Sequence, residues 1–313
     1  MSLGFVVSGS SGFIGSAFCR YIESLGDRVL RLTRSTRCID GNSISYSEFL
    51  AGSSTKVKNF EPDIFVNCSA IAHKIVGLSR SRYTEAQIFD VNSRLPVTLA
   101  KVCESYMFKR YIFLSSVGVH GSSSSVPLTE TSPYLPENIY SASKIVAECS
   151  LREFAYTSPL DLVILRPTLV YGPGCPGNLS FLKQLIDIGF PLPLKGVFNM
   201  RSFLYLDNLL DALHFLSLHS NSSGHSFLIS DSEIISSACL SATICELRDS
   251  RSMFLPLPPL LVSSLSRFRP FSRFYEKLSC DLFVDTTKLV DQFNWVQPFS
   301  QSEGLARSFS INS

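Results

Sequence analysis

The chain has 313 residues, of which 45% are hydrophobic and 17% charged, so it can bury a large core and does not have the composition of a disordered protein. Its net charge of +2 is too small to indicate a nucleic-acid surface, and no basic stripe with interleaved aromatic residues occurs. No apolar run reaches transmembrane length and no signal-peptide pattern precedes the first glycines, which predicts a cytoplasmic protein without a membrane span.

The N-terminal residues predict a strand, a glycine loop, a helix and a second strand. The apolar run 3–8 is typical of a buried strand, 13–25 of a helix that Gly26 ends, and 28–33 of a second strand. The loop has a G-x-x-G-x-x-G spacing, and its glycines let the backbone approach a pyrophosphate at the start of the helix. We therefore assign to cofactor binding Gly9, Ser11, Gly12, Phe13, Ile14 and Gly15.

The residues after the second strand bear on the choice between NAD and NADP. A carboxylate there would bind the ribose 2′-hydroxyl of NAD, but this chain has Arg34 and Arg37 and no acid before Asp40. The planar fork of an arginine can hold a 2′-phosphate, although the alternative is a solvated surface arginine. We assign Arg34 to the cofactor and favour NADP slightly over NAD.

Further along the chain, strands and helices continue to alternate. Residues 36–59 are expected to be irregular with one short helix. The apolar pattern predicts strands at 63–68, 110–115 and 161–166 and helices at 83–106 and 140–156. This order predicts an α/β fold with a Rossmann-type, doubly wound parallel sheet in residues 1–166. Residues 167–313 are rich in proline and predict mainly a smaller C-terminal substrate-binding lobe, with some segments returning to the sheet.

Tyr140, Lys144 and the pair Ser115 and Ser116 are the catalytic candidates. Residues 140 and 144 project from one face of a helix, and an ammonium beside a phenol lowers the pKa of that phenol. A serine hydroxyl at the end of a strand can hydrogen-bond a substrate oxygen while the tyrosine transfers a proton. Tyr-x-x-x-Lys alone is often a surface pair, but together with the glycine loop it indicates hydride transfer with a nicotinamide cofactor.

Histidine and cysteine give weaker indications. His73 follows a predicted strand end, where it would touch substrate or serve a structural role. The nine cysteines include no Cys-x-x-Cys pair and the five histidines are isolated, so no metal site is expected.

In these motifs the chain resembles the extended short-chain dehydrogenases/reductases of the NAD-dependent epimerase/dehydratase family, which mostly act on nucleotide sugars. Besides the glycine loop, the segments that carry the resemblance are 67–70, 113–121, 140–144, 166–174 and 201–203. In this family the catalytic serine falls on Ser116. Dehydratases of the family have Thr-Asp-Glu where this chain has Ser116-Val117-Gly118, so a 4,6-dehydratase is not expected.

The resemblance also implies roles for residues outside the catalytic set. On the cofactor side it implies Ser69, Ala70, Ala72, Asn92, Pro167 and Thr168, the last two near the carboxamide. On the substrate side it implies Asn178, Arg201 and Arg273 at the diphosphate, in addition to His73, Ser115 and Ser116. His120 stands where many 4-epimerases carry a tyrosine, and Trp295 resembles a packing position.

What the resemblance implies for function is NAD(P)-dependent chemistry at C4 of a UDP-sugar. Three C-terminal segments resemble a subgroup of bacterial surface-polysaccharide synthesis, which favours reduction of a UDP-4-keto-6-deoxy-hexosamine. The first alternative is a UDP-glucose-type 4-epimerase with retained NAD. The others are a non-enzymatic NAD(P)-binding regulator and a reductase of lipid substrates. Family members often dimerise through two long helices, here 83–106 and 140–156, so a homodimer is expected.

Overall fold

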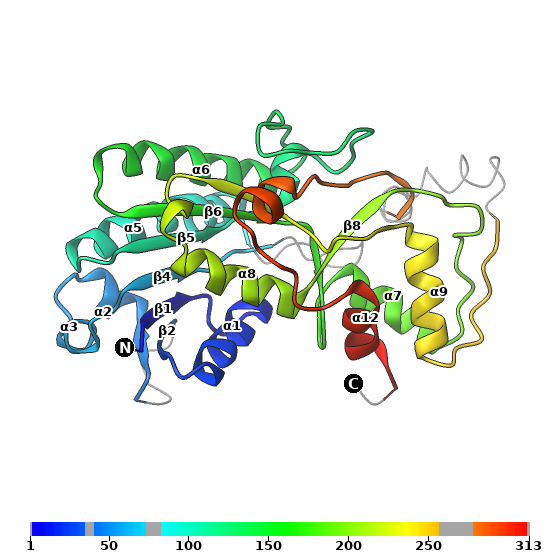
Figure 1. Ribbon diagram of the computed structural model, residues 1–313, viewed down its shortest axis with the longest axis horizontal. Coiled ribbons are helices and arrows are strands. Elements are labelled where there is room, and N and C mark those ends of the chain that lie inside the picture. Colours follow the sequence, from blue (N-terminus) through cyan, green and yellow to red (C-terminus); the bar gives the residue numbers. More distant parts are fainter. Residues whose placement is uncertain (1, 35–40, 73–82, 257–277, 312–313) are drawn as a thin grey trace.

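A seven-stranded parallel sheet with helices on both faces forms the body of the molecule, in the strand order β3-β2-β1-β4-β5-β6-β9 (Figure 1). The structure is a computed structural model and describes residues 2–34, 41–72, 83–256 and 278–311. The strands are β1 (Gly4–Ser8), β2 (Arg28–Thr33), β3 (Ser43–Ser45), β4 (Ile64–Asn67), β5 (Arg110–Leu114), β6 (Asp161–Pro167) and β9 (Ser226–Ile229). The predicted Rossmann-type fold is confirmed.

Two hydrophobic layers cover the two faces of this sheet. Helices α1 (Phe13–Ser24) and α8 (Leu206–Leu218) pack on one face together with Phe5 and Val7 of β1. The opposite face, which carries Val6, is covered by α2 (Tyr46–Leu50), α3 (Thr55–Phe60), α5 (Leu95–Ser105) and α6 (Ile139–Thr157). A strand that is buried on both faces reads as a continuous apolar run, which is why β1 could be recognised in the sequence.

Two stretches differ from the sequence-based expectation. The described residues 41–60 contain β3 and two short helices, α2 and α3, where the sequence predicted one helix. The Ser45 hydroxyl accepts a hydrogen bond from the Glu48 amide and so begins α2 directly after a three-residue strand. The long helix expected at 83–106 is divided into α4 (Glu85–Phe89), a π-helical turn η1 (Asp90–Arg94) and α5. Such a turn re-aims side chains within a helix, and here it turns Asn92 and Ser93 toward α6.

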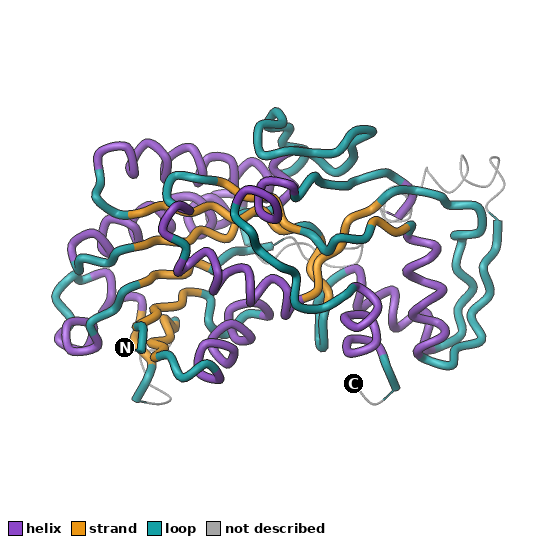
Figure 2. Tube along the Cα trace, in the orientation of Figure 1, coloured by secondary structure: helices purple, strands orange, loops and turns teal. Residues whose placement is uncertain are grey.

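A smaller second layer follows β6. It contains a three-stranded sheet in the order β10-β8-β7, made of β7 (Leu169–Tyr171), β8 (Arg201–Tyr205) and β10 (Ile234–Ile235). In the described residues its helices are α7 (Asn178–Asp187), α9 (Ser237–Leu247) and α12 (Gln301–Phe309), around a core of their own. Figure 2 shows that long loops make up much of this part. Strand β9 and helix α8 return from it to the large sheet.

The carboxyl ends of the parallel strands place the candidate residues along one edge of the sheet. The glycine loop follows β1, Ser69 follows β4, Ser116 follows β5 and Thr168 follows β6. The edge at which parallel strands end is where α/β sheets bind ligands. Among the described residues, no helix is long and apolar enough to cross a membrane.

Candidate functional site

The glycine loop after β1 is folded tightly against itself. Gly9 has a positive φ of 68°, and its carbonyl accepts a hydrogen bond from the Gly12 amide at 2.9 Å. A Cβ on Gly15 would lie 2.3 Å from the Gly9 oxygen, so only glycine allows α1 to start this close to the loop. Gly12 precedes α1 and offers no side-chain cap, which leaves the first N–H groups of the helix for an anion. The loop therefore fits a pyrophosphate.

Tyr46 is a residue at this loop that the sequence analysis did not single out. Its hydroxyl accepts a hydrogen bond from the Gly9 amide at 3.2 Å. Burial raises the pKa of Tyr46, while hydrogen bonds with Gly9, Ser69 and Ser8 oppose that rise. The signal that could have revealed it is an aromatic residue directly after β3, but that strand is too short to show in the sequence pattern.

Arg34 is exposed directly after the end of β2. This is the position from which a side chain reaches the adenosine ribose of a bound dinucleotide. Arg37 and Asp40, the other residues weighed for cofactor choice, lie outside the described residues.

Side-chain hydrogen bonds from Asn67 and Asn92 hold the segment after β4 in place. Ser69 is buried and donates to Asn67 Oδ1 at 2.6 Å, while Ala70 and Ala72 are exposed toward the sheet edge. Asn92 donates to the Ile71 carbonyl at 3.0 Å and accepts from the Ile71 amide at 2.7 Å, and its second amide hydrogen bonds Ser143. Both amide hydrogens of Asn92 are thus used in holding this segment, and its assignment to the cofactor stays a prediction.

Ser116 and Tyr140 lie together at the end of β5. Ser116 begins the short helix η2 (Val117–His120), and its Oγ accepts a hydrogen bond from the Gly118 amide at 3.1 Å. The Ser116 hydroxyl also interacts with the Tyr140 phenol, which comes from α6. Burial raises the pKa of Tyr140 to about 12, and the hydrogen bond with Ser116 only partly offsets that rise.

Lys144 lies one helical turn after Tyr140 and is deeply buried. Its ammonium donates to the Leu114 carbonyl at 2.7 Å and lies 4.4 Å from the centre of the Phe113 ring. Burial lowers the pKa of Lys144 to about 8. The expectation that Lys144 lowers the pKa of Tyr140 is not met in this structure, because the ammonium bonds the strand and burial dominates at the phenol.

Ser115 and Ser116 face different surroundings although they are adjacent. Ser115 is buried, and among the described residues its hydroxyl has no hydrogen-bond partner. Successive side chains of an extended segment point to opposite faces, so only one of two adjacent serines can face Tyr140. Ser116 is therefore the serine that we expect to act with Tyr140, and the substrate contact expected of Ser115 stays a prediction.

Thr168 carries an unsatisfied buried hydroxyl next to β6. Among the described residues its Oγ1 has no hydrogen-bond partner, and the side chain is only 5% exposed. A buried hydroxyl without a partner is unfavourable, so this position suits a ligand amide. With Pro167 before it and the glycine loop nearby at the same edge, the residues present fit a nicotinamide dinucleotide.

The two candidate diphosphate contacts come from separate elements of the smaller layer. Asn178 begins α7, and its Oδ1 is buried without a partner among the described residues. Arg201 on β8 is buried and donates to the Cys280 carbonyl at 3.1 Å, and burial lowers its pKa. His73 and Arg273 lie outside the described residues.

A cavity of about 400 Å³ lies between the start of α1 and the segment that leads to Asn178. Its lining includes Gly12, Phe13, Arg20, Pro173 and Pro176. Within the part of the chain that the structure describes, no group of His, Cys, Asp and Glu side chains could hold a metal ion.

Comparison with known proteins agrees with this geometry. The model of the NAD dependent epimerase/dehydratase family matches residues 5–230. A UDP-glucose 4-epimerase of Vibrio cholerae is 27% identical over 97% of this chain and 93% of its own length.

Two solved structures are similar in fold. The UDP-N-acetylglucosamine 4-epimerase from Bacillus cereus has a TM-score of 0.76 at 17% identity, with 97% of each chain covered. The UDP-glucuronic acid 4-epimerase from Bacillus cereus in complex with NAD has a TM-score of 0.75 at 17% identity, and 98% of this chain and 95% of that chain are covered.

Proposed function

Since the chain belongs to the NAD-dependent epimerase/dehydratase family, we propose that it transfers hydride between a nicotinamide cofactor and C4 of a UDP-sugar. The observation that carries this proposal is the meeting of Ser116, at the end of β5, with the half-buried Tyr140 at the start of α6, where Lys144 follows one turn along the same helix. The glycine loop and the unsatisfied Thr168 hydroxyl at the same sheet edge support a dinucleotide beside them.

The roles of the three side chains follow from their chemistry. A bound nicotinamide would supply or accept the hydride. For reduction of a 4-ketone, Tyr140 donates its proton to the 4-oxygen, and Ser116 holds that oxygen by a hydrogen bond. For oxidation of a 4-hydroxyl the same proton moves in the opposite direction. Lys144, one helical turn after Tyr140, is the cation that we propose to orient the cofactor ribose.

Within this chemistry we favour reduction of a UDP-4-keto-6-deoxy-hexosamine, as in polysaccharide synthesis. A pKa of about 12 keeps Tyr140 protonated at neutral pH, and a protonated phenol is the form that reduction of a ketone requires. The exposed Arg34 after β2 suits the 2′-phosphate of NADPH, which would exchange between turnovers.

The second candidate is a UDP-glucose-type 4-epimerase with retained NAD. It is supported by the relatives, since the Vibrio cholerae protein and both Bacillus cereus proteins are named as 4-epimerases of UDP-sugars. In this version Tyr140 first accepts the 4-hydroxyl proton and later returns it, so no external reductant is consumed.

Mass spectrometry of the ligand released from the denatured, purified protein separates the two candidates. Retained NAD, one per subunit, would favour the epimerase. An empty protein that binds NADPH more tightly than NADH would favour the ketoreductase. Interconversion of UDP-glucose and UDP-galactose without added cofactor would overturn the ketoreductase version. Failure to bind either dinucleotide would contradict the whole proposal.

We further propose that residues 1–166 bind the dinucleotide, that residues 167–313 mainly bind the sugar nucleotide, and that the chain forms a homodimer through α5 and α6. On α6, Val146, Cys149 and Tyr156 are exposed along one side of the helix. Light scattering coupled to size exclusion tests the dimer: the wild type should have twice the mass of a Val146→Glu variant. A monomeric wild type would refute it.

A further inference from the structure

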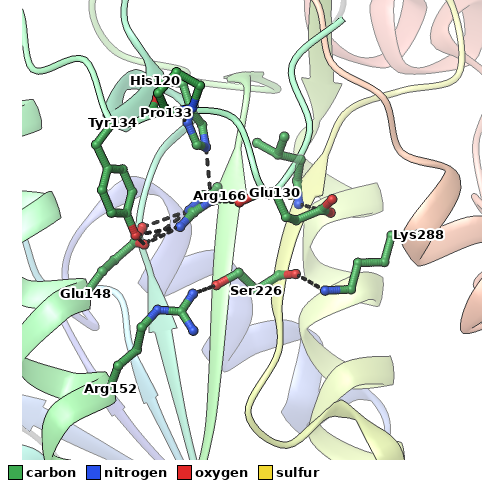
Figure 3. A network of polar contacts seen from close by, with 10 residues as sticks. His120, Glu130, Pro133, Tyr134, Glu148, Arg152, Arg166, Ser226 and Lys288 are labelled. Atoms are coloured by element: carbon green, nitrogen blue, oxygen red, sulfur yellow. Dashed lines mark hydrogen bonds and ion pairs between the residues drawn. The ribbon is translucent and has the colours of Figure 1, made fainter.

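A polar cluster lies where β6, α6 and η2 meet, and we call its four side chains Arg166, Glu148, Tyr134 and His120 the Arg166 cluster (Figure 3). The ion pair between Arg166 and Glu148 is almost fully buried, with side-chain exposures of 2% and 0%. Tyr134 donates to the Glu148 carboxylate at 2.7 Å. Each N–H group of the guanidinium has a partner: the Glu148 carboxylate, the Tyr134 hydroxyl, the Glu130 carbonyl and His120.

These contacts determine the protonation state of His120. Arg166 Nη1 lies 3.0 Å from His120 Nε2, and a guanidinium can only donate, so Nε2 must be the unprotonated nitrogen. The proton then resides on Nδ1, which donates to the Pro133 carbonyl at 3.1 Å. Burial lowers the pKa of His120, and Arg166 lowers it further, while Glu148 and the backbone of Pro133 and Ser132 oppose that shift.

The segment that carries Ser116 is held at both ends by β6, and the cluster provides one of the two contacts. At the start of this segment, the Ser115 amide donates to the Leu165 carbonyl at 2.7 Å. At the other end of η2, the His120 ring bonds Arg166, the residue next to Leu165 on β6. One strand therefore holds both ends of a short segment with Ser116 inside it.

The cluster also connects this segment to α6. Glu148 lies one helical turn after Lys144 and two turns after Tyr140, so the three side chains share one face of α6. Arg166 bonds Glu148 on α6 and His120 on η2 at the same time. The separation between the Ser116 hydroxyl and the Tyr140 phenol thus depends on the guanidinium between the two elements.

We propose that neutral His120, acting through Arg166, is a positioning residue that keeps the Ser116 hydroxyl in line with the Tyr140 phenol, an inference that rests on the proposed C4 reaction. Protonation of His120 would bring a second cation against Arg166 inside a buried cluster, which breaks the contact and releases η2. Activity is therefore lost on the acid side as His120 becomes protonated, and the loss occurs in kcat and not in substrate binding.

Two variants of the full-length protein test this proposal. In His120→Leu the Arg166 donor loses its acceptor, and we expect kcat to fall about 10- to 100-fold while KM and the dinucleotide Kd stay within about twofold. In His120→Gln the side-chain oxygen can accept from Arg166, so a larger share of kcat should return. Because glutamine does not titrate, the acid limb of the pH profile of kcat should disappear in this variant.

His225→Gln is the matched control. His225 is exposed beside β9, and burial together with Lys288 and Arg152 lowers its pKa as well. This variant should keep both the kcat and the acid limb of the wild type. An acid limb that persists in His120→Gln, or a His120→Leu protein that loses only thermal stability, would overturn the proposal.

A measurement without turnover gives an independent test. In two-bond ¹H–¹⁵N correlation spectra, with His120→Gln used to assign the signal, His120 should show the Nδ1-protonated neutral tautomer and titrate below the usual pKa range of histidine. The other tautomer, or a titration at the usual pKa, would refute the inference. If Ser116→Ala and Tyr140→Phe leave sugar turnover intact, the proposed function fails instead, whatever the spectra of His120 show.

Discussion

Three ionisable side chains follow one another at one-turn intervals on the inner face of α6, and burial affects each of them differently. At Tyr140 burial raises the pKa to about 12, and at Lys144 it lowers the pKa to about 8, because it penalises the charged form in both cases. At Glu148 the bonds from Arg166 outweigh burial and lower the pKa. The helix therefore presents a neutral proton donor, a cation that is easily neutralised and a paired carboxylate.

Replacement of Tyr140 by phenylalanine tests the proton donor. We expect kcat to fall about 10²- to 10⁴-fold, since the group that transfers the proton is removed. The dinucleotide Kd and the melting temperature should stay close to those of the wild type, because the ring remains. Steady-state kinetics and calorimetric titration measure both effects. Tyr156→Phe, at an exposed position of the same helix, is the control, and equal losses in the two variants would contradict the assignment.

Replacement of Lys144 by methionine should change activity and stability in opposite directions. Activity should be lost, while the free energy of unfolding at pH 7 rises by about 1–3 kcal/mol, because a charge held in a buried site is removed. Since the folded pKa of about 8 lies below the unfolded value, the wild type loses stability as pH falls from about 10.4 to 8.

Thermal unfolding between pH 7 and pH 10 measures this difference. The gap between Lys144→Met and the wild type should be widest at the low-pH end, and Lys101→Met on the exposed side of α5 should show no gap. A gap that widens as the pH rises would have the wrong sign and contradict the explanation.

At the scale of single elements, the connection between β1 and α1 depends on close backbone contact. Gly15→Ala would place a methyl group 2.3 Å from the Gly9 carbonyl oxygen, and neither backbone can yield without moving the loop. We expect a loss of about 1–3 kcal/mol in the free energy of unfolding and a weaker dinucleotide Kd.

Denaturant unfolding and dinucleotide titration check this prediction. Gly41→Ala is the matched control, because nothing lies within 4 Å of a Cβ at that position and its φ is not positive. Unchanged dinucleotide affinity in Gly15→Ala would show that the loop does not hold the cofactor.

Cationic side chains cover the free edge of β9, the last strand of the large sheet. Strand β9 is at the edge of the seven-stranded sheet, where unpaired backbone groups favour association with other chains. Arg152 donates to the Ser226 hydroxyl, and Lys288 donates to the Ser226 carbonyl at 2.9 Å (Figure 3). The Lys288 ammonium also lies over the Phe227 ring. Two cations thus cover this edge.

At the scale of the whole molecule, the Arg166–Glu148 pair joins the central sheet to α6. When one partner of a buried ion pair is removed, the other charge is left uncompensated, so Glu148→Gln should lower the free energy of unfolding by about 3–5 kcal/mol at pH 7. Glu153→Gln, at an exposed position of the same helix, should change it by less than about 0.5 kcal/mol.

The same cluster predicts how stability depends on pH. Folding lowers the pKa of both Glu148 and His120, so their contribution is complete above the usual pKa of histidine. The contribution of His120 is lost as the pH falls below about 6.5 and that of Glu148 as it falls below about 4.3, because the unfolded chain then binds more protons. Melting temperatures below about pH 4.3 should therefore fall less steeply in Glu148→Gln than in the wild type, and parallel curves in that range would contradict this assignment.

The sequence was sufficient for features that depend on local chemistry. The strand, glycine loop and helix from residue 3 onward were predicted because apolar runs, glycine spacing and helix periodicity are local properties. Tyr140 and Lys144 share a face of α6 because their spacing matches one helical turn. The family was recognised from short motifs for the same reason.

Only the tertiary structure decided which side chains meet. The family motif indicated Ser116, but the sequence could not show that Ser116 lies near Tyr140 while Ser115 is buried, because this depends on how β5 packs against α6. It could not show that Tyr46 reaches Gly9, or that Arg166 binds Glu148 and His120, since these contacts join distant segments. The same holds for the pKa values. The residue type gives the usual pKa, whereas the direction of each shift depends on burial and on partners, which exist only in the folded chain.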